Sequence, residues 1–410
     1  MFEALEIPNT LAAGPGPGNT DPQVLASFSR CGVADHMQAD VLRGMREAKF
    51  MLRELFGTNN AYTFGVGGTG WSGIDCMMSA VLPGDKVVAF VNGTFSGIDD
   101  LAIRMRASSR SDLAANPDNP KPANVITINV PHGESVTGDI VKAALAEHQP
   151  KWAIMTHWET GSGRINDIEG FSYACQKHGV MGLIDAVSSL GVADFSIDDY
   201  PGVAAWASCP QKGVLCLPLT YAPVSFTDQY INSLKATGTY SYVHNPILEA
   251  RHWGIIDGKD TDTAVYHRTH SGYAVAAFHE ALRILLAHGR AQKATDYAFY
   301  ESVLREAVEA MGCEVTSNMT SLVVLNLPGD FAGREKELVQ NCRADGFGIW
   351  PTLSEPVQVR IGILNQLTNA AITDIISRFS DAMIAMGVPV DKTAVMAKVD
   401  SRLGSIKVAA

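Results

Sequence analysis

Two residues in the middle of the chain, Asp185 and Lys212, have side chains and positions that suit catalysis. Leu183 and Ile184 end a short apolar run that predicts a buried strand, and Asp185 stands where this strand stops. A second apolar run, over residues 204–208, is followed by Cys-Pro-Gln and then by Lys212. An acid and an amine that each follow a buried strand indicate a ligand site or a catalytic pair. A salt bridge between strand ends, or two unrelated solvated turns, would give the same pattern.

The elements that must position these residues alternate between helices and strands. We expect helices at 38–56, 71–82, 95–106, 139–148 and 170–178, further strands at 86–91, 125–130 and 152–155, and a hairpin-like stretch at 214–221. This alternation predicts the α/β class, with a mostly parallel sheet covered by helices on both faces. The polar, proline-bearing residues 107–123 are interpreted as a surface insertion.

The pattern changes after residue 273. A long helix is expected at 273–288, strands at 313–316, 321–326 and 357–363, and helices at 335–344 and 369–386. These elements predict a smaller α+β domain. We therefore divide the chain into an N-terminal arm (1–20), a large domain (21–288), a small C-terminal domain (289–386) and a peripheral tail (387–410).

Composition excludes several classes of protein. A net charge of −11 without a dense Lys/Arg run argues against binding to nucleic acid. The seven cysteines are scattered, with no CxxC pair and no histidines at zinc spacing, so we expect reduced thiols and no metal site. No apolar run approaches the roughly 18 residues that a membrane span needs. A cytoplasmic protein that binds neither membrane nor nucleic acid is expected.

The glycine run at residues 65–70, GVGGTG, matches the dinucleotide pattern GxGxxG. That function also requires an acid at the end of the next strand, about 20 residues on, to bind a ribose hydroxyl. The next strand ends Val91-Asn92-Gly93, so a nicotinamide oxidoreductase is poorly supported. Small residues and Thr69 at the start of a helix still suit a phosphate, although a tight turn alone would explain the glycines.

Seven stretches, in order, resemble the class V, fold-type I pyridoxal-phosphate aminotransferases of the alanine– or serine–glyoxylate kind: GGTGWSG, PGDKVVAFVNGTF, THWETGSG, LIDAVSSLG, SCPQKG, YHRT and VRIG. The resemblance runs from GPGPGN at residues 14–19 to VRIGIL at 359–364. It implies a seven-stranded sheet in the large domain, pyridoxal 5′-phosphate (PLP) as cofactor, and a homodimer with shared active sites.

The resemblance also assigns roles. Lys212 matches the Schiff-base lysine, and Asp185 matches the acid that keeps the pyridine nitrogen protonated. Phe95 matches the residue that stacks on the ring, and Thr160 the hydroxyl near its phenolic oxygen. Arg360 matches the arginine that grips the substrate carboxylate in two parallel hydrogen bonds.

The phosphate turn is matched by Thr69, Gly70 and Trp71, with Gln211 beside it, and Tyr266 and Thr269 match residues that reach the partner subunit's phosphate. The predicted cofactor contacts are Thr69, Gly70, Trp71, Phe95, Thr160, Asp185, Val187, Gln211, Lys212, Tyr266 and Thr269; the predicted substrate contacts are Arg360 and Gly16; the predicted catalytic residues are Lys212 and Asp185. His157 and His267 are interpreted as structural rather than catalytic.

The expected reaction moves an amino group from an alanine- or serine-like donor to glyoxylate or pyruvate. Pro210, Trp71 and the segments 107–123 and 240–252 depart from the family pattern, which leaves the substrate open. The alternatives are an aminotransferase for a carboxylate-free amine such as 2-aminoethylphosphonate, a PLP-dependent lyase or desulfurase-like enzyme, and a non-catalytic relative. A desulfurase needs a mobile nucleophilic cysteine, whereas Cys342 falls in a predicted helix.

Overall fold

The computed structural model describes residues 4–5, 7, 9–30 and 35–405 of the chain. They form two compact units: one contains residues 20–294, and the other joins the described residues of Met1–Asn19 to those of Thr295–Ala410. The sequence analysis had instead divided the chain after residues 20, 288 and 386. No helix within the described residues is long and apolar enough to cross a membrane.

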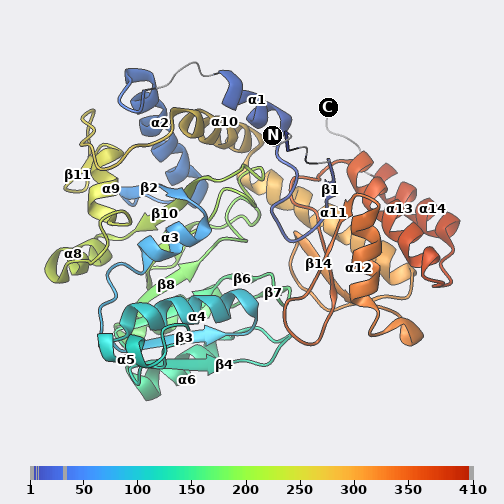
Figure 1. The fold of residues 1–410 in the computed structure, drawn as a ribbon, viewed down its shortest axis with the longest axis horizontal. Coiled ribbons are helices and arrows are strands. Elements are labelled where there is room, and N and C mark those ends of the chain that lie inside the picture. Colours follow the sequence, from blue (N-terminus) through green and yellow to red (C-terminus); the bar gives the residue numbers. More distant parts are fainter. Residues whose placement is uncertain (1–3, 6, 8, 31–34, 406–410) are drawn as a thin grey trace. The chain divides into compact units, whose positions relative to one another are not determined.

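The unit of residues 20–294 is built on a seven-stranded sheet with the order β2-β10-β9-β8-β5-β3-β4 (Figure 1). Its strands are β2 (Tyr62–Gly68), β3 (Val87–Val91), β4 (Val125–Asn129), β5 (Trp152–Thr156), β8 (Met181–Asp185), β9 (Val203–Ala207) and β10 (Thr220–Phe226). Strand β10 runs opposite to the other six strands of this sheet, which all point in one direction. The predicted α/β class with a mostly parallel sheet is confirmed.

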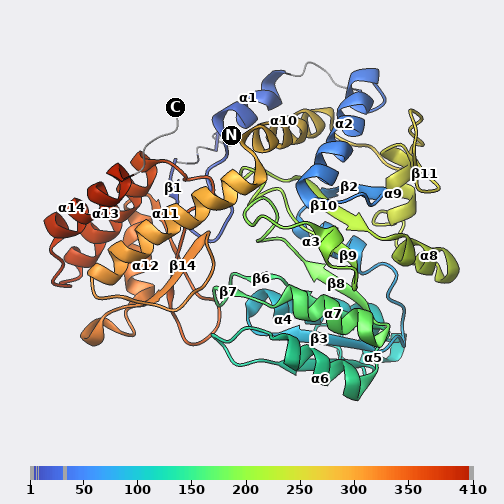
Figure 2. The same cartoon turned by 180° about the vertical axis from the view of Figure 1, so that it is seen from behind.

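Helices cover both faces of this sheet, which explains why every residue of β5 and β9 is buried. Helix α4 (Thr94–Ala107) lies in front of the sheet in Figure 1, whereas α6 (Gly138–His148) and α7 (Ile168–His178) lie in front of it in Figure 2, after a half turn. The remaining elements of this unit are α1 (Pro22–Arg30), α2 (Ala39–Phe56), α3 (Gly70–Met77), α5 (Arg110–Ala115), β6 (Trp158–Glu159), β7 (Arg164–Ile165), α8 (Asp228–Thr237), α9 (Pro246–His252), β11 (Ile255–Ile256), β12 (Lys259–Asp260) and α10 (Gly272–His288).

The other unit contains a four-stranded antiparallel sheet with the order β13-β14-β17-β16. Its strands are β13 (Glu314–Val315), β14 (Leu322–Asn326), β16 (Trp350–Pro351) and β17 (Val359–Gly362), and its helices are α12 (Glu335–Ala344), α13 (Asn369–Ala385) and α14 (Lys392–Gly404). Strand β1 (Leu11–Ala12), from the start of the chain, pairs in parallel with β15 (Phe347–Gly348). Helix α11 (Arg290–Ala310) carries the chain from one unit into the other.

Several elements differ from those predicted. The apolar stretch after Gly213 is a turn rather than part of a hairpin, with Leu215 and Cys216 at φ of 52° and 53°. Gly213 packs directly on the backbone of Leu190, which leaves no room for a Cβ atom. Helix α11 was not predicted, and residues 392–404 of the predicted peripheral tail form α14, whose buried residues are Val395, Val399 and Leu403.

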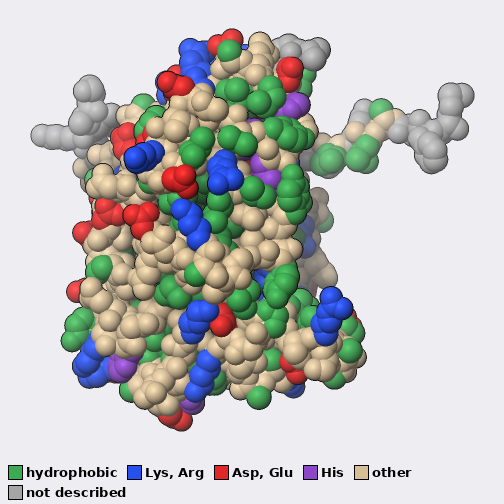
Figure 3. Space-filling view, turned by 90° about the vertical axis from the view of Figure 1, so that its left-hand side faces the viewer, with side chains coloured by type: hydrophobic (Ala, Val, Ile, Leu, Met, Phe, Trp, Pro, Cys, Tyr) green, Lys and Arg blue, Asp and Glu red, His purple; other side chains and the backbone are tan. Residues whose placement is uncertain are grey.

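The charged surface agrees with the composition. On the face shown in Figure 3, lysine and arginine side chains are scattered among acidic and apolar ones rather than gathered into one patch. This face therefore presents no continuous basic surface of the kind that binds a phosphate backbone.

Candidate active site

Asp185 and Lys212 meet at one edge of the large sheet. Asp185 is the last residue of β8, and Lys212 lies in the turn after β9, the neighbouring strand. Because β8 and β9 are parallel, their carboxyl ends lie at the same edge, where ligands bind in sheets of this kind. The structure thus brings together the acid and the amine that the sequence places 27 residues apart.

Lys212 is buried beside an aromatic ring. Its Nζ donates a hydrogen bond to Ser188 Oγ at 2.9 Å and lies 5.2 Å from the centre of the Phe95 ring. Phe95 stands in the first turn of α4, directly after β3, so three strand ends converge here. Ser188 was not among the predicted site residues, although its place three residues after Asp185 was a usable signal.

The Asp185 carboxyl group is buried, and burial raises its pKa to about 6. The backbone N–H of Val187, which donates to Asp185 Oδ1 at 2.7 Å, and the charge of Lys212 oppose this rise. The negative charge of Glu159 adds to it. A cation placed against Asp185 would lower this raised pKa and hold the group as a carboxylate at neutral pH.

The turn that begins α3 lies against these strand ends. Thr69 caps the helix, its Oγ1 accepting a hydrogen bond from the N–H of Trp71 at 3.1 Å. A Cβ atom at Gly70 would stand 3.1 Å from Val187 and 3.0 Å from Cys209, so only glycine fits without displacement. The N-terminal N–H groups of α3 are thereby held next to the Asp185 and Lys212 turns, where they suit an anion.

Glu159 fixes the loop that carries Phe95. Its carboxylate accepts hydrogen bonds from the N–H groups of Phe95, Ser96 and Gly161 at 3.3, 2.7 and 2.6 Å. Thr160 follows it directly and is buried. Glu159 was not predicted as a site residue, and its signal was its place between His157-Trp158 and Thr160 in a matched stretch.

The residues at this edge fit PLP. The Phe95 ring beside Lys212 suits a flat aromatic ring, Asp185 suits its nitrogen, and the α3 turn suits its phosphate. Gln211 precedes Lys212, and its Oε1 is buried without a hydrogen-bond partner among the described residues, as expected of a side chain that faces a ligand. Gln211, Thr69 and Gly70 would hold the phosphate, and Phe95 and Asp185 the ring.

Tyr266 and Thr269 lie on an exposed stretch, with their hydroxyl oxygens 3.3 Å apart. His267 between them is buried and bonded to Glu249 at 3.0 Å, consistent with a structural role. His157 is also buried, with Nδ1 3.0 Å from Ser189 Oγ, and burial lowers its pKa to about 3. A histidine that stays neutral throughout the physiological range does not serve as an acid at neutral pH.

Arg360 and Gly16 belong to the other unit. Arg360 is a buried residue of β17, and its Nε donates a hydrogen bond to the carbonyl of Pro351 at 3.0 Å. Gly16, at φ 107°, lies on the arm that Ala13 anchors to β17 through a 2.8 Å bond from the N–H of Gly362. The other predicted site residues all lie in the unit of residues 20–294.

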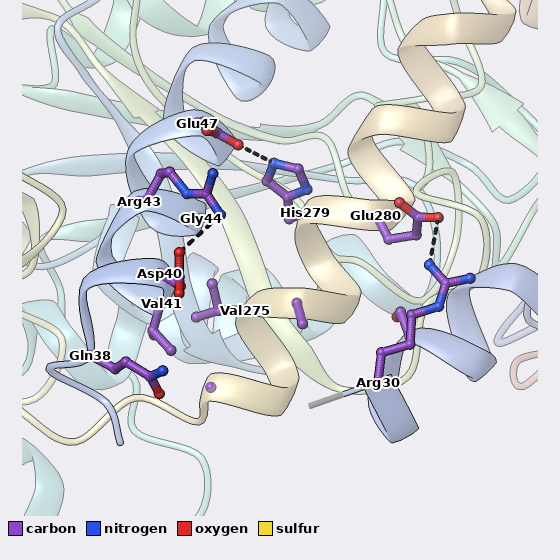
Figure 4. A pocket seen from close by; sticks show the side chains of 13 residues that line it. Arg30, Gln38, Asp40, Val41, Arg43, Gly44, Glu47, Val275, His279 and Glu280 are labelled. Carbon is purple, nitrogen blue, oxygen red and sulfur yellow. Dashed lines mark hydrogen bonds and ion pairs between the residues drawn. The ribbon is translucent and has the colours of Figure 1, made fainter. Parts of the chain in front are cut away.

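A cavity of about 480 Å³ lies elsewhere, between α1, α2 and α10 (Figure 4). Its rim carries an ion pair between His279 and Glu47 at 2.7 Å, and Val41 and Val275 line its wall. None of its lining residues belongs to the predicted site. This cavity is therefore separate from the residues that the sequence predicts for the site.

Comparison with known proteins gives one consistent family. No protein-family model matches the chain. The mouse alanine–glyoxylate aminotransferase is 28% identical over 292 residues, which cover 70% of this chain and 65% of that protein, and the rat enzyme is 30% identical over the same shares. Thus the matched region spans about two thirds of the length of these relatives. The (S)-ureidoglycine–glyoxylate transaminase of Bacillus subtilis is 24% identical over 82% of this chain and 80% of its own.

A solved structure extends this likeness to nearly the whole chain. The alanine–glyoxylate aminotransferase of Nostoc sp. superposes with a TM-score of 0.83 at 25% identity, covering 93% of this chain and 97% of that one. The shared fold, the converging strand ends and these relatives agree with the seven matched sequence stretches. The chain is thus similar, over nearly all of its length, to the class V, fold-type I pyridoxal-phosphate aminotransferases.

Proposed function

We propose that this protein is a PLP-dependent aminotransferase that moves an amino group from a small amino acid, alanine or serine-like, to glyoxylate or pyruvate. The observation that carries the proposal is the meeting of Asp185 and Lys212 at adjacent parallel strand ends, with the Phe95 ring 5.2 Å from Nζ. The names of the mouse and Nostoc relatives support alanine and glyoxylate as the substrate pair.

Each predicted site residue has a separate role in this reaction. When bound, PLP supplies the electron sink for the substrate's α-carbon. Lys212 provides the amine that holds the cofactor covalently, and then moves a proton at that carbon. Asp185 would provide the negative charge that keeps the ring nitrogen protonated, and Phe95 would offer its ring as an apolar surface for the cofactor. Thr69 and the N–H groups of α3 bind the phosphate.

We assign Arg360 the recognition of the substrate carboxylate. A guanidinium group binds a carboxylate through two parallel hydrogen bonds, which a lysine cannot reproduce. The fixed place of the side chain supports this assignment: Arg360 is buried on β17, and its Nε donates a 3.0 Å hydrogen bond to the carbonyl of Pro351.

Loss of Arg360 should weaken every amino-acid donor. We expect Arg360→Lys to raise KM by about tenfold and Arg360→Ala by about a hundredfold, because a bond to a charged group contributes ~1.5–3 kcal/mol. The measurement is steady-state kinetics with alanine, serine, aspartate, 2-aminoethylphosphonate and taurine against glyoxylate and pyruvate. The two donors that lack a carboxylate serve as the internal control, since their KM should not depend on Arg360.

The same panel tests the function itself. Activity with alanine or serine and glyoxylate is the expected result. If 2-aminoethylphosphonate or taurine is the best donor, the amino-acid assignment is wrong and Arg360 serves the keto acid alone.

We also propose a cytoplasmic homodimer in which each active site needs both subunits. The exposed Tyr266, 56% of whose surface is accessible, and the neighbouring Thr269 support this, because their hydroxyl groups are available to a second copy of the chain. The described cysteines are six buried free thiols, consistent with a reducing compartment. Cys31 lies outside the described residues.

A shared site predicts recovery of activity on mixing two inactive variants. Lys212→Ala and the double variant Tyr266→Phe/Thr269→Ala should each be nearly inactive. After dissociation and reassociation at equal amounts, half of the dimers are mixed and have one native site each, so activity should return to about a quarter of the native value. Lys212→Ala reassociated with itself is the control, and a mixture that stays inactive would show that each subunit holds its own site.

A further inference from the structure

A second buried carboxyl group, Asp99, lies beside Asp185. Asp99 is in the second turn of α4 and is 2% exposed, while Asp185 is 4% exposed. Thr156 Oγ1 donates a hydrogen bond to Asp99 Oδ2 at 2.8 Å, and Thr156 is the residue of β5 that pairs with Asp185 of β8. The helix thus places an acid at the strand end that carries Asp185, next to the residue that pairs with Asp185, and the negative charge of Asp185 acts on Asp99.

The surroundings of this pair favour one proton on it. The charged groups that face it are Lys212, which acts on Asp185, and Glu159, whose negative charge acts on both acids. Burial, and next the charge of Asp185, raise the pKa of Asp99 well above its usual value. Two carboxylates in contact away from water cannot both ionise at neutral pH, because their repulsion adds to the cost of burial.

The hydrogen bonds of Asp99 also indicate that this residue carries the proton of the pair. Asp99 Oδ1 is fully buried and, with both acids ionised, has no donor among the described residues. A proton on Asp99 removes this deficit, because the neutral acid can donate to the Asp185 carboxylate while Oδ2 still accepts from Thr156. Asp185 Oδ1 already accepts the N–H of Val187, so its carboxylate would be held from two sides.

We propose that Asp99 is a positioning residue for Asp185: as a neutral acid it donates a hydrogen bond that holds the Asp185 carboxylate in the orientation in which it would bind the ring nitrogen of the cofactor. This inference rests on the proposed function, because it gives Asp185 its purpose. It requires that the pair keep one proton over the pH range in which the enzyme works.

The test compares Asp99→Asn with Asp99→Ala. Asparagine keeps a donor for Asp185 and an acceptor for Thr156 but cannot ionise, whereas alanine removes both. We expect the dissociation constant for PLP, measured by fluorescence titration, to stay within about threefold of the native value for Asp99→Asn and to rise at least about tenfold for Asp99→Ala. Asp100→Asn is the matched control, because Asp100 is the next residue of α4 but pairs with Arg104 and Thr127.

A second measurement needs no cofactor and detects the proton. A group whose pKa is raised by folding stabilises the fold below its unfolded pKa, and this contribution is lost as pH rises through the folded pKa. Urea unfolding of the cofactor-free full chain should therefore show a fall in stability from about pH 4 upward that is steeper in the native protein than in Asp99→Asn. One proton corresponds to about tenfold in the unfolding constant per pH unit.

The outcomes separate the two proposals. Native affinity in Asp99→Ala, or equal damage from asparagine and alanine, would overturn the hydrogen-bond role. Equal pH slopes for the native protein and Asp99→Asn would show that Asp99 holds no proton and overturn the neutral acid. If stability falls more steeply with pH in the native protein than in Asp99→Asn, but the native protein does not bind PLP, then Asp99 does hold a proton. The proposed function, and with it the role of Asp99 in positioning Asp185 for the cofactor, would then be wrong.

Discussion

Turnover should fall by about four orders of magnitude or more in Lys212→Ala, because the covalent attachment of the cofactor and the proton transfer at the substrate fail together. Lys212 is buried, its Nζ is bonded to Ser188 at 2.9 Å, and it lies beside the Phe95 ring, so a lysine on the surface cannot take its place. The measurement is kcat with the best donor, together with borohydride reduction and mass spectrometry of the native protein to locate the bound cofactor.

Lys212→Arg is the matched control. It keeps the positive charge that acts on Asp185 but cannot form the covalent bond, so it should retain stability yet be as inactive as Lys212→Ala. Ser188→Ala, which removes only the hydrogen bond to Nζ, should cost far less. Cofactor fixed by borohydride to a lysine other than Lys212, or an active Lys212→Arg, would contradict the assignment.

Asp185→Asn should slow each half-reaction by about a hundredfold or more, ~3 kcal/mol of activation free energy. Asparagine preserves the shape of the side chain and the bond from Val187 N–H, but it removes the negative charge that favours a protonated ring nitrogen. The measurement is single-turnover kinetics with saturating cofactor, so that weaker binding is not mistaken for slower chemistry. An unchanged rate would show that ring protonation does not depend on Asp185.

The main positions of this site follow from local sequence, because Asp185 ends an apolar run and Lys212 follows another one within a few residues. Asp185 and Lys212 could be predicted as strand-end residues since polar side chains that terminate buried strands stand out against their neighbours. The turn after Gly213 could not, because its apolar residues read as a strand and nothing local indicates that Leu215 and Cys216 adopt positive φ. That conformation arises from the packing of Gly213 on a distant segment.

The role of Asp99 could not be predicted from the sequence, for a different reason. It stands four residues after Phe95 and four before the buried Ile103, so helical spacing places all three on one face of α4. An acid in a helix is normally taken as solvated, and only the contact with Thr156 and Asp185, more than 50 residues away in the sequence, shows otherwise. Helix α11 was missed for a related reason: its composition is largely polar, although Tyr297, Val303 and Leu304 are buried.

The pairing of β1 with β15 bears on the order in which the protein is made. Residues 20–294 are continuous, so this unit can finish folding on the ribosome as soon as it has emerged. The arm at residues 9–19 is synthesised first, yet its partner strand, Phe347–Gly348, comes more than 330 residues later. Strand β1 therefore leaves the ribosome long before its partner, and a message truncated before residue 347 would yield a chain in which Leu11–Ala12 has no β15 to pair with.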